Sequence, residues 1–268
     1  MKLQLTNGYY VRFDQISRLM QYIYTNGNST IPRQEIMEET GFSDRQLENL
    51  NSISIGLGLL KPRVYKLTEL GIEISRKDPF FDNDETLWIL HYIISCNPKY
   101  IVWHRLVNIV FAQHEMTSSE AIRQYFNDLK EYYSEKSIKS HLTKEIRSVL
   151  NAYTEQLFNR LGILSKHNNN SYVVGANVNV SFLSFLYMVL YYKGFIGWNA
   201  SSIDIDAIST NPNSPGKVLN IPLKKIEELL DRAHDNGFIR LEKFGDLDQI
   251  RFDENLTKEM ILKKIYGD

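Results

Sequence analysis

The chain has 268 residues, a formal net charge of −1 and a single cysteine, Cys96. This length allows a large core and two or three compact units. The near-neutral charge excludes binding to nucleic acid through overall positive charge, so any such binding must come from local patches. One cysteine excludes an internal disulfide. The N-terminal residues do not resemble a signal peptide, and the apolar runs are too short to cross a bilayer, so we expect a cytoplasmic protein without membrane attachment.

Three helices are predicted near the N-terminus. Residues 11–24 carry apolar side chains at intervals of three to five, which predicts an amphipathic helix. Pro32 suits a first helical turn, and the helix it opens is expected to stop at Gly41. The next helix is expected to begin at Ser43, because Gln46 follows three residues later and completes a capping-box pattern.

Two short extended pieces are predicted after the third helix. They are Leu59–Leu60 and Val64–Leu67, joined by a turn that contains Pro62. Thr68 then caps a last short helix. Helix, short turn, helix and small hairpin is the order of a winged helix-turn-helix, in which the helix from Ser43 would be the recognition helix.

The next segment predicts a helical core. Asp84 is expected to cap a helix that is apolar nearly all round and is broken at Asn97–Pro98, and a second helix of this kind follows. Helices without a polar face belong in the interior of a bundle. Trp88 and Trp103 are therefore expected to be core residues. A further helix is expected after the cap signature at residues 117–120.

Residues 135–150 predict an amphipathic helix with a basic face. Its apolar stripe consists of Ile138, Leu142, Ile146 and Val149. At 100° per residue, the opposite sector holds Lys136, Lys139, Ser140, Thr143 and Arg147. Lysine, arginine and hydroxyl side chains are typical of phosphate contacts. The alternative is an ordinary solvated face, balanced by Glu135 and Glu145.

A helix that ends at glycine and leads into a hairpin is predicted three times, near residues 57–67, 161–174 and 236–252. The third hairpin would turn at Gly245–Asp246. Residues 198–220 are expected to form a long surface connection with one short helix around residues 204–208. The predicted fold is therefore mainly α, with several winged helix-turn-helix-like units and short hairpin wings around a helical bundle core.

The expected domain boundaries follow from these units. They are an N-terminal winged unit at 1–78, a helical core at 79–197 with a second wing-like hairpin near 163–174, and a C-terminal winged unit at 198–268. Motifs for nucleotide phosphates, dinucleotides and zinc are absent, and no histidines have the spacing of a helical metal pair. We therefore expect no catalytic residues, no metal and no cofactor, although a dispersed active site stays open.

The stretch from Asp78 to Asn108 resembles a bacterial family that is known as domain-of-unknown-function family 4007. The residues that carry the resemblance are Asp78–Pro79, Thr86–Trp88, Leu90–His91, Asn97–Pro98, Trp103 and Asn108. The resemblance is expected mainly in the first half of the chain. It implies an accessory protein that is often encoded beside DNA sulfur-modification or phage-defence genes, and it brings no catalytic residues. A motif near GHETF that commonly opens the family is replaced here by LTNGYYVRF.

Two functions follow as hypotheses. The first is duplex-DNA binding by a winged helix-turn-helix in such a system. Its expected contacts are Arg45, Gln46, Asn49, Ser52, Lys61, Arg63, Lys66, Lys136, Lys139 and Arg147. The second is a non-catalytic adaptor that assembles a multi-component complex without touching DNA. Protein partners are expected in either case, and a homodimer is left open.

Overall fold

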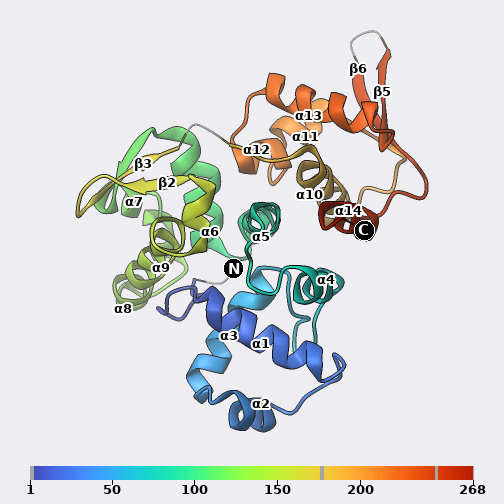
Figure 1. Cartoon of the computed structure of the whole chain (residues 1–268). Helices are drawn as coiled ribbons and strands as arrows, with labels where there is room; N and C mark the ends of the chain where they lie inside the picture. The colour runs from blue at the N-terminus through green and yellow to red at the C-terminus, as the bar shows by residue number, and fades with distance from the viewer. Residues whose placement is uncertain (1–2, 176–177, 245–246, 268) are drawn as a thin grey trace. The chain divides into compact units, whose positions relative to one another are not determined.

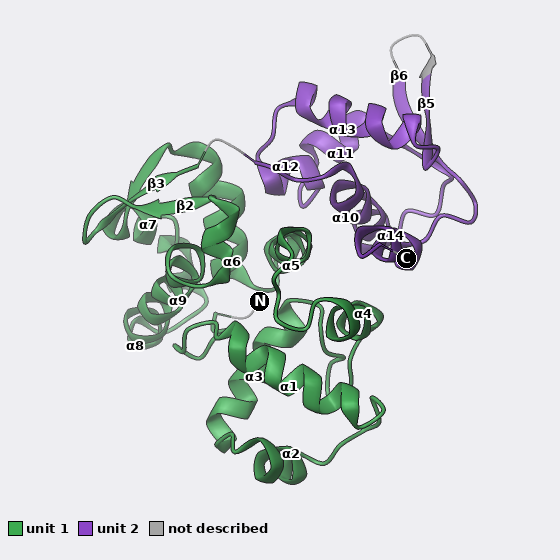
Figure 2. Ribbon diagram, viewed as in Figure 1, with its two compact units in different colours: residues 1–177 green, residues 178–268 purple. Residues whose placement is uncertain are grey.

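The computed structural model describes residues 3–175, 178–244 and 247–267, and the predicted turn at Gly245–Asp246 lies outside them. The chain divides into two compact units, Met1–Asn177 and Val178–Asp268 (Figure 2). The domain boundaries expected at residues 78 and 197 do not coincide with the boundary between these units. The division into three domains stays a prediction. The protein is mainly α, with two small three-stranded antiparallel sheets (Figure 1).

The first unit begins with four helices. They are α1 (Phe13–Thr25), α2 (Arg33–Thr40), α3 (Asp44–Gly56) and α4 (Glu69–Lys77). The predicted capping box is confirmed, since Ser43 accepts from the N–H of Gln46 and the Gln46 side chain accepts from the N–H of Ser43. Gly41 ends α2 in the left-handed conformation (φ 67°) that glycine tolerates best.

The hairpin predicted after α3 is reduced to one isolated antiparallel bridge, Leu60 to Leu67. The two arms still pair by backbone hydrogen bonds, because the N–H of Lys61 bonds the carbonyl of Lys66 at 2.8 Å and the N–H of Thr68 bonds that of Leu59 at 3.0 Å. Pro62 has no N–H to donate, and the N–H of Lys66 bonds the carbonyl of Val64 within the turn. The paired part is therefore shorter than the hairpin that the sequence predicted.

The rest of the first unit adds further helices and a sheet. Its helices are α5 (Asp84–Cys96), α6 (Ile101–Arg105), the π-helix η1 (Leu106–Phe111), α7 (Ser119–Gln124), the 3-10 helix η2 (Asn127–Glu131), α8 (Glu135–Ser137), the π-helix η3 (Ile138–Leu142), α9 (Thr143–Thr154) and the 3-10 helix η4 (Leu157–Leu161). Its strands are β1 (Met116–Ser118), β2 (Leu164–Lys166) and β3 (Ser171–Val174). Strand β3 pairs with both of the others, in the order β1-β3-β2.

The core of the first unit contains a buried hydrogen-bonded cluster of Trp103, Tyr153 and His91. Trp103, 1% exposed, donates from Nε1 to the hydroxyl of Tyr153 at 2.9 Å, and that hydroxyl lies 2.7 Å from Nδ1 of His91. Burial lowers the pKa of His91 to about 3, so the ring is neutral and Nδ1 can accept the tyrosine proton. Trp88 is also buried. The expectation that both tryptophans are core residues is confirmed, and His91 is buried as well.

The second unit starts with the apolar helix α10. Its helices are α10 (Phe182–Phe195), α11 (Ile205–Thr210), α12 (Pro215–Leu219), α13 (Leu223–Asp235) and α14 (Lys258–Ile265). Its strands are β4 (Ser202–Asp204), β5 (Ile239–Phe244) and β6 (Leu247–Phe252), in the order β4-β6-β5.

The short helix expected around residues 204–208 is confirmed as α11, but the long surface connection expected over residues 198–220 is wrong. It contains a strand and two helices, because its scattered apolar residues, such as Ile203, Ile208 and Leu219, are buried. Ser214 caps α12 and Pro215 occupies its first turn. Low apolar content concealed these short elements, since β4 buries one residue, α11 buries two and α12 buries four.

The two sheets share one topology. In both, the first strand pairs with the third, and the second lies on the other side of the third. The long segment between the first and second strands is helical in each case, and its last α-helix is α9 in the first unit and α13 in the second. The 3-10 helix η4 lies between α9 and β2, whereas α13 leads directly into β5. Within the described residues, no helix is both long and apolar enough to span a membrane.

Candidate nucleic-acid interface

The helix that precedes the β2–β3 hairpin carries a row of exposed cations. Within this row, Lys136, Lys139, Lys144 and Arg147 are exposed. None of the three lysines forms an ion pair with a described residue. The interval of five between Lys139 and Lys144 follows from the π-helical turn η3, which has one more residue per hydrogen-bonded ring than an α-helix.

The π-turn corrects the predicted basic face. A regular period of 100° per residue placed Thr143 in the row, but Thr143 is half-buried and Lys144 occupies that side. The opposite, apolar stripe is confirmed for Leu142, Ile146 and Val149, which are buried, whereas Ile138 is half-buried. Glu145 is also buried at 1% exposure, so it does not balance the basic row as a solvated counter-charge.

Glu145 attaches the N-terminal segment to α9. Its carboxylate accepts from the N–H groups of Leu5 and Thr6 and from the Thr6 hydroxyl, the last at 2.7 Å. Beyond this anchor, Ser148 donates to the carbonyl of Tyr9, and the Arg147 guanidinium lies 5.8 Å from the ring centre of Tyr10. The N-terminal segment LTNGYYVRF, which replaces the GHETF-like motif, therefore packs against α9.

Helix α3 presents fewer of its predicted contacts than expected. Arg45 is exposed, whereas Gln46 and Ser52 are half-buried. Asn49 is only 4% exposed, so the expectation that it faces solvent is wrong. It lies on the side of α3 that the N-terminal segment covers, and a helical period alone could not reveal that cover.

The turn after α3 carries the other predicted cations. Lys61 and Arg63 are exposed and Lys66 is half-buried. Asp44 at the start of α3 is paired with Arg33, whose guanidinium also donates to the Asp44 carbonyl at 2.9 Å. The charge around α3 is therefore mixed, unlike the row on α8–α9.

The structure brings together residues that the sequence interpretation kept apart. A pocket of about 220 Å³ lies between the N-terminal segment and α3. It is lined by Tyr9, Tyr10, Arg12, Gln15, Gln46 and Asn49. Sequence reasoning missed Tyr9, Tyr10, Arg12 and Lys144; the adjacent tyrosines beside an arginine in GYYVR were the available signal.

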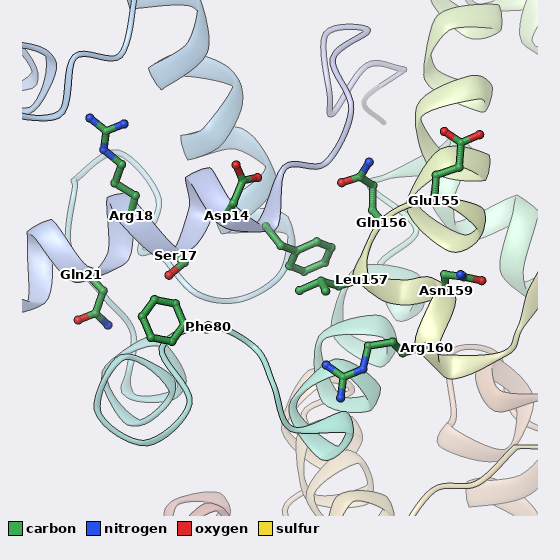
Figure 3. A pocket seen from close by; sticks show the side chains of 11 residues that line it. Asp14, Ser17, Arg18, Gln21, Phe80, Glu155, Gln156, Leu157, Asn159 and Arg160 are labelled. Carbon is green, nitrogen blue, oxygen red and sulfur yellow. The ribbon is translucent and has the colours of Figure 1, made fainter.

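A larger pocket of about 810 Å³ lies elsewhere in the first unit (Figure 3). Helix α1, the loop at Phe80 and the segment around η4 supply its lining. Its charged groups already have partners: Arg160 pairs with Asp84 at 2.6 Å, and Asp14 pairs with Arg12 at 2.8 Å. Phe80, which belongs to the lining, is 69% exposed.

The residues that carried the family resemblance are mostly structural. Asp78 Oδ1 accepts from the N–H of Asp82 at 2.7 Å, and burial raises its pKa. Asn108 donates to the carbonyls of Ser95 and His104, both at 2.9 Å. Burial raises the pKa of Cys96 to about 12, so its reactive thiolate is suppressed. In the described part of the chain, no group of three or more His, Cys, Asp or Glu side chains could hold a metal ion.

The fold is similar to known structures, and the sequence matches a family model. No curated protein matches the sequence. The structure is similar to one titled "SspB crystal structure", with a TM-score of 0.75, 15% identity and coverage of 97% of this chain and 86% of that chain. A "Magnesium ion-bound SspB crystal structure" gives a TM-score of 0.74 and 14% identity with the same coverage. These likenesses concern the fold.

The family model extends further than the sequence motifs indicated. It matches residues 57–266, which is most of the chain, so the expectation of a match mainly in the first half is wrong. The motif at residues 78–108 was noticed first because it contains distinctive tryptophan and proline residues. The chain belongs to the family described as "Protein of unknown function (DUF4007)".

Proposed function

We propose that this protein binds duplex DNA through its first unit, with the α8–α9 helix and its basic row as the main contact. One observation carries the proposal. The α8–α9 helix exposes a row of four cations on both sides of the π-helical turn η3: Lys136, Lys139, Lys144 and Arg147. The three lysines have no ion-pair partner among the described residues. Unpaired lysines on a helix are suited to replacing the counterions of phosphates.

The surrounding topology supports a winged helix-turn-helix in which α8–α9 is the recognition helix. It is the last α-helix before the β2–β3 hairpin, from which the short 3-10 helix η4 separates it, and β1 completes the sheet on the far side of β3. In such modules the helix before the wing enters the major groove. The second unit has the same order of elements, and α1–α3 with the Leu60–Leu67 bridge would be a third, less regular copy.

The N-terminal copy would add flanking contacts. Arg45, Lys61 and Arg63 are exposed, and Lys66 is half-buried beside them in sequence. The nearby acids Asp44 and Glu48 weaken the local positive potential, so we assign these cations to backbone positioning instead of sequence reading. Membership of the family agrees with an accessory, non-catalytic role in a bacterial DNA-modification or phage-defence system, which is part of this proposal.

The proposal is tested by a salt titration of binding to a fluorescent duplex. Replacing Lys136, Lys139 and Lys144 by alanine removes three exposed cations and should lower the slope of log K against log salt by roughly three units, at about 0.9 per phosphate contact. The matched control replaces Lys224, Lys263 and Lys264, three exposed lysines of the second unit. An equal loss in both variants, or none in the first, would contradict the assignment.

A second candidate function is a protein adaptor, and α13 favours it. Its exposed acids Glu227, Glu228, Asp231 and Asp235 outnumber its exposed cations Lys224 and Arg232. An acidic helix in the recognition position repels phosphate and suits a basic protein surface. If duplex binding is absent at low salt, yet capture of a co-purifying partner requires these acids, the adaptor role replaces DNA binding.

A further inference from the structure

The outer face of α13 carries negative charge at regular intervals. Three exposed acids lie four residues apart along it: Glu227, Asp231 and Asp235. None of these three forms an ion pair with a described residue, whereas the neighbouring Glu228 lies 3.7 Å from Lys225. One helix face therefore presents three carboxylates that are available to the cations of another molecule.

The cations of α13 offset these acids only in part. Lys225 is held by Glu228, and the Arg232 guanidinium lies 5.2 Å from the ring centre of Phe182 on α10. Lys224 is exposed in the first turn, before the acids begin. Like charges four residues apart destabilise a helix, so a basic surface that covers these acids relieves their mutual repulsion.

The basic row on α8–α9 has the opposite charge and a matching length. Its lysines extend from Lys136 through Lys139 to Lys144, and the acids extend from Glu227 to Asp235. Each of these two intervals covers eight residues, which corresponds to about 12 Å of α-helix. When two such helices lie side by side, three lysines can face three acids along their whole length.

We propose that the basic row of one copy of this protein binds the acidic face of α13 of a second copy. The contact joins two different surfaces, so it is heterologous and can continue from copy to copy. Exposed ion pairs contribute little individually and are screened by salt, so this association is weak and is expected at low ionic strength. The same cations cannot hold phosphates at that moment, so duplex DNA competes with self-association, a consequence that rests on the proposed function.

Sedimentation velocity over a range of protein concentrations measures the association. At about 20 mM salt, the sedimentation coefficient of the wild type should rise with protein concentration, and the association constant should fall by about tenfold at about 200 mM salt, because the Debye length shortens. A coefficient that does not change with protein concentration at low salt would overturn the inference, since no second copy would then occupy the row.

Two charge-reversal variants assign the contact to these faces. The acid variant carries Glu227→Lys, Asp231→Lys and Asp235→Lys, and the row variant carries Lys136→Glu, Lys139→Glu and Lys144→Glu. Each variant alone should lose self-association, because its row and its α13 then have the same charge. An equimolar mixture should regain it, because each row meets an α13 of opposite charge in the other variant, and this recovery also shows that both variants are folded. A mixture that stays monomeric would contradict the contact.

The matched control separates these positions from net charge. It replaces by glutamate three exposed lysines that lie outside α13 and the row: Lys99, Lys263 and Lys264. This variant has the same net charge as the row variant, but it should associate as the wild type does. If it loses self-association as well, net charge and not the contact is responsible, and the inference is overturned.

Failure of this contact and failure of the proposed function are distinguishable, because self-association is measured without DNA. If the wild type binds duplex in a salt-dependent way but stays monomeric, only the inference is wrong. If self-association requires both faces but no duplex binds, the inference holds and the proposed function is wrong. When both hold, added duplex should release the second copy, and assemblies that persist while duplex occupies the row would overturn the inference.

Discussion

The helices α8–α9 and α13 occupy equivalent places in two sheets of identical strand order, yet their outer surfaces are opposite in charge. The first exposes the row from Lys136 to Arg147, with Glu135 as its exposed acid. The second exposes four acids, and Lys225 lies 3.7 Å from Glu228. Topology alone therefore does not identify a nucleic-acid-binding helix, because the same scaffold can present either charge.

Their inner faces also differ. Helix α9 carries Tyr153 into a hydrogen-bonded aromatic core, and the Tyr153 and Phe158 rings stack at 5.4 Å. Helix α13 buries only aliphatic side chains, Ile226, Leu229, Leu230 and Ala233. A buried polar group specifies one arrangement, since each misplaced partner leaves an unsatisfied atom. The basic helix is consequently held by a more specific core than the acidic one.

The largest expected effect concerns that core. Trp103→Ala should lower the free energy of unfolding by about 3–5 kcal/mol, because it creates a cavity and removes the donor to Tyr153. Trp88→Ala should cost a similar amount. Trp198→Ala is the matched control in the second unit, where the side chain is 43% exposed, and its cost should be far smaller. Denaturant unfolding measures all three, and equal costs would contradict the comparison.

A charge exchange on α13 tests whether charge alone separates the two helices. Replacing Glu227, Glu228 and Asp231 by lysine should create salt-dependent duplex binding in the second unit, with a slope steeper by roughly three units at about 0.9 per phosphate. The measurement is made with the α9 lysines already replaced by alanine. If no binding appears, shape or the wing, and not charge, distinguishes the helices.

The neutral His91 predicts a dependence of stability on pH. Its pKa is about 3 in the folded protein against 6.5 in the unfolded chain, so the unfolded chain binds more protons between these values. The free energy of unfolding should therefore fall as pH drops from 6.5 toward 3, by at most about 1.4 kcal/mol per unit. His91→Gln should flatten this slope, whereas His234→Gln on α13 retains His91 and keeps it.

The smallest effect concerns the turn after α3. Arg63 has a positive φ of 71°, which costs an L-residue about 1–2 kcal/mol. Arg63→Gly should relieve this strain and raise the melting temperature slightly, while reducing the salt slope of DNA binding by about one unit. Arg45→Ala, without that backbone change, is the control. A lower melting temperature for the glycine variant would contradict the strain argument.

Much of the local structure was predictable. The caps at Ser43, Thr68 and Ser118 lie where the sequence patterns placed them. The apolar helix α5 is also confirmed, but its cap is Asn83 and not the expected Asp84. The all-round apolar pattern of this helix and the next one also identified Trp88 and Trp103 as core residues. The candidate interface was predictable in part, because the basic stretch from Lys136 to Arg147 was recognised but its true row was not.

The amino-acid sequence by itself determined the features that depend on hydrogen bonds within one or two turns: helix starts, glycine ends and amphipathic faces. Only the tertiary structure decided which distant segments pack against those helix faces. The pairing of β1 with β3 joins Met116 to Val173, and the Glu145 carboxylate captures Thr6 from 139 residues away. Such contacts bury Asn49 and form its pocket. Their energy depends on groups that no local period relates, so local patterns could not predict them.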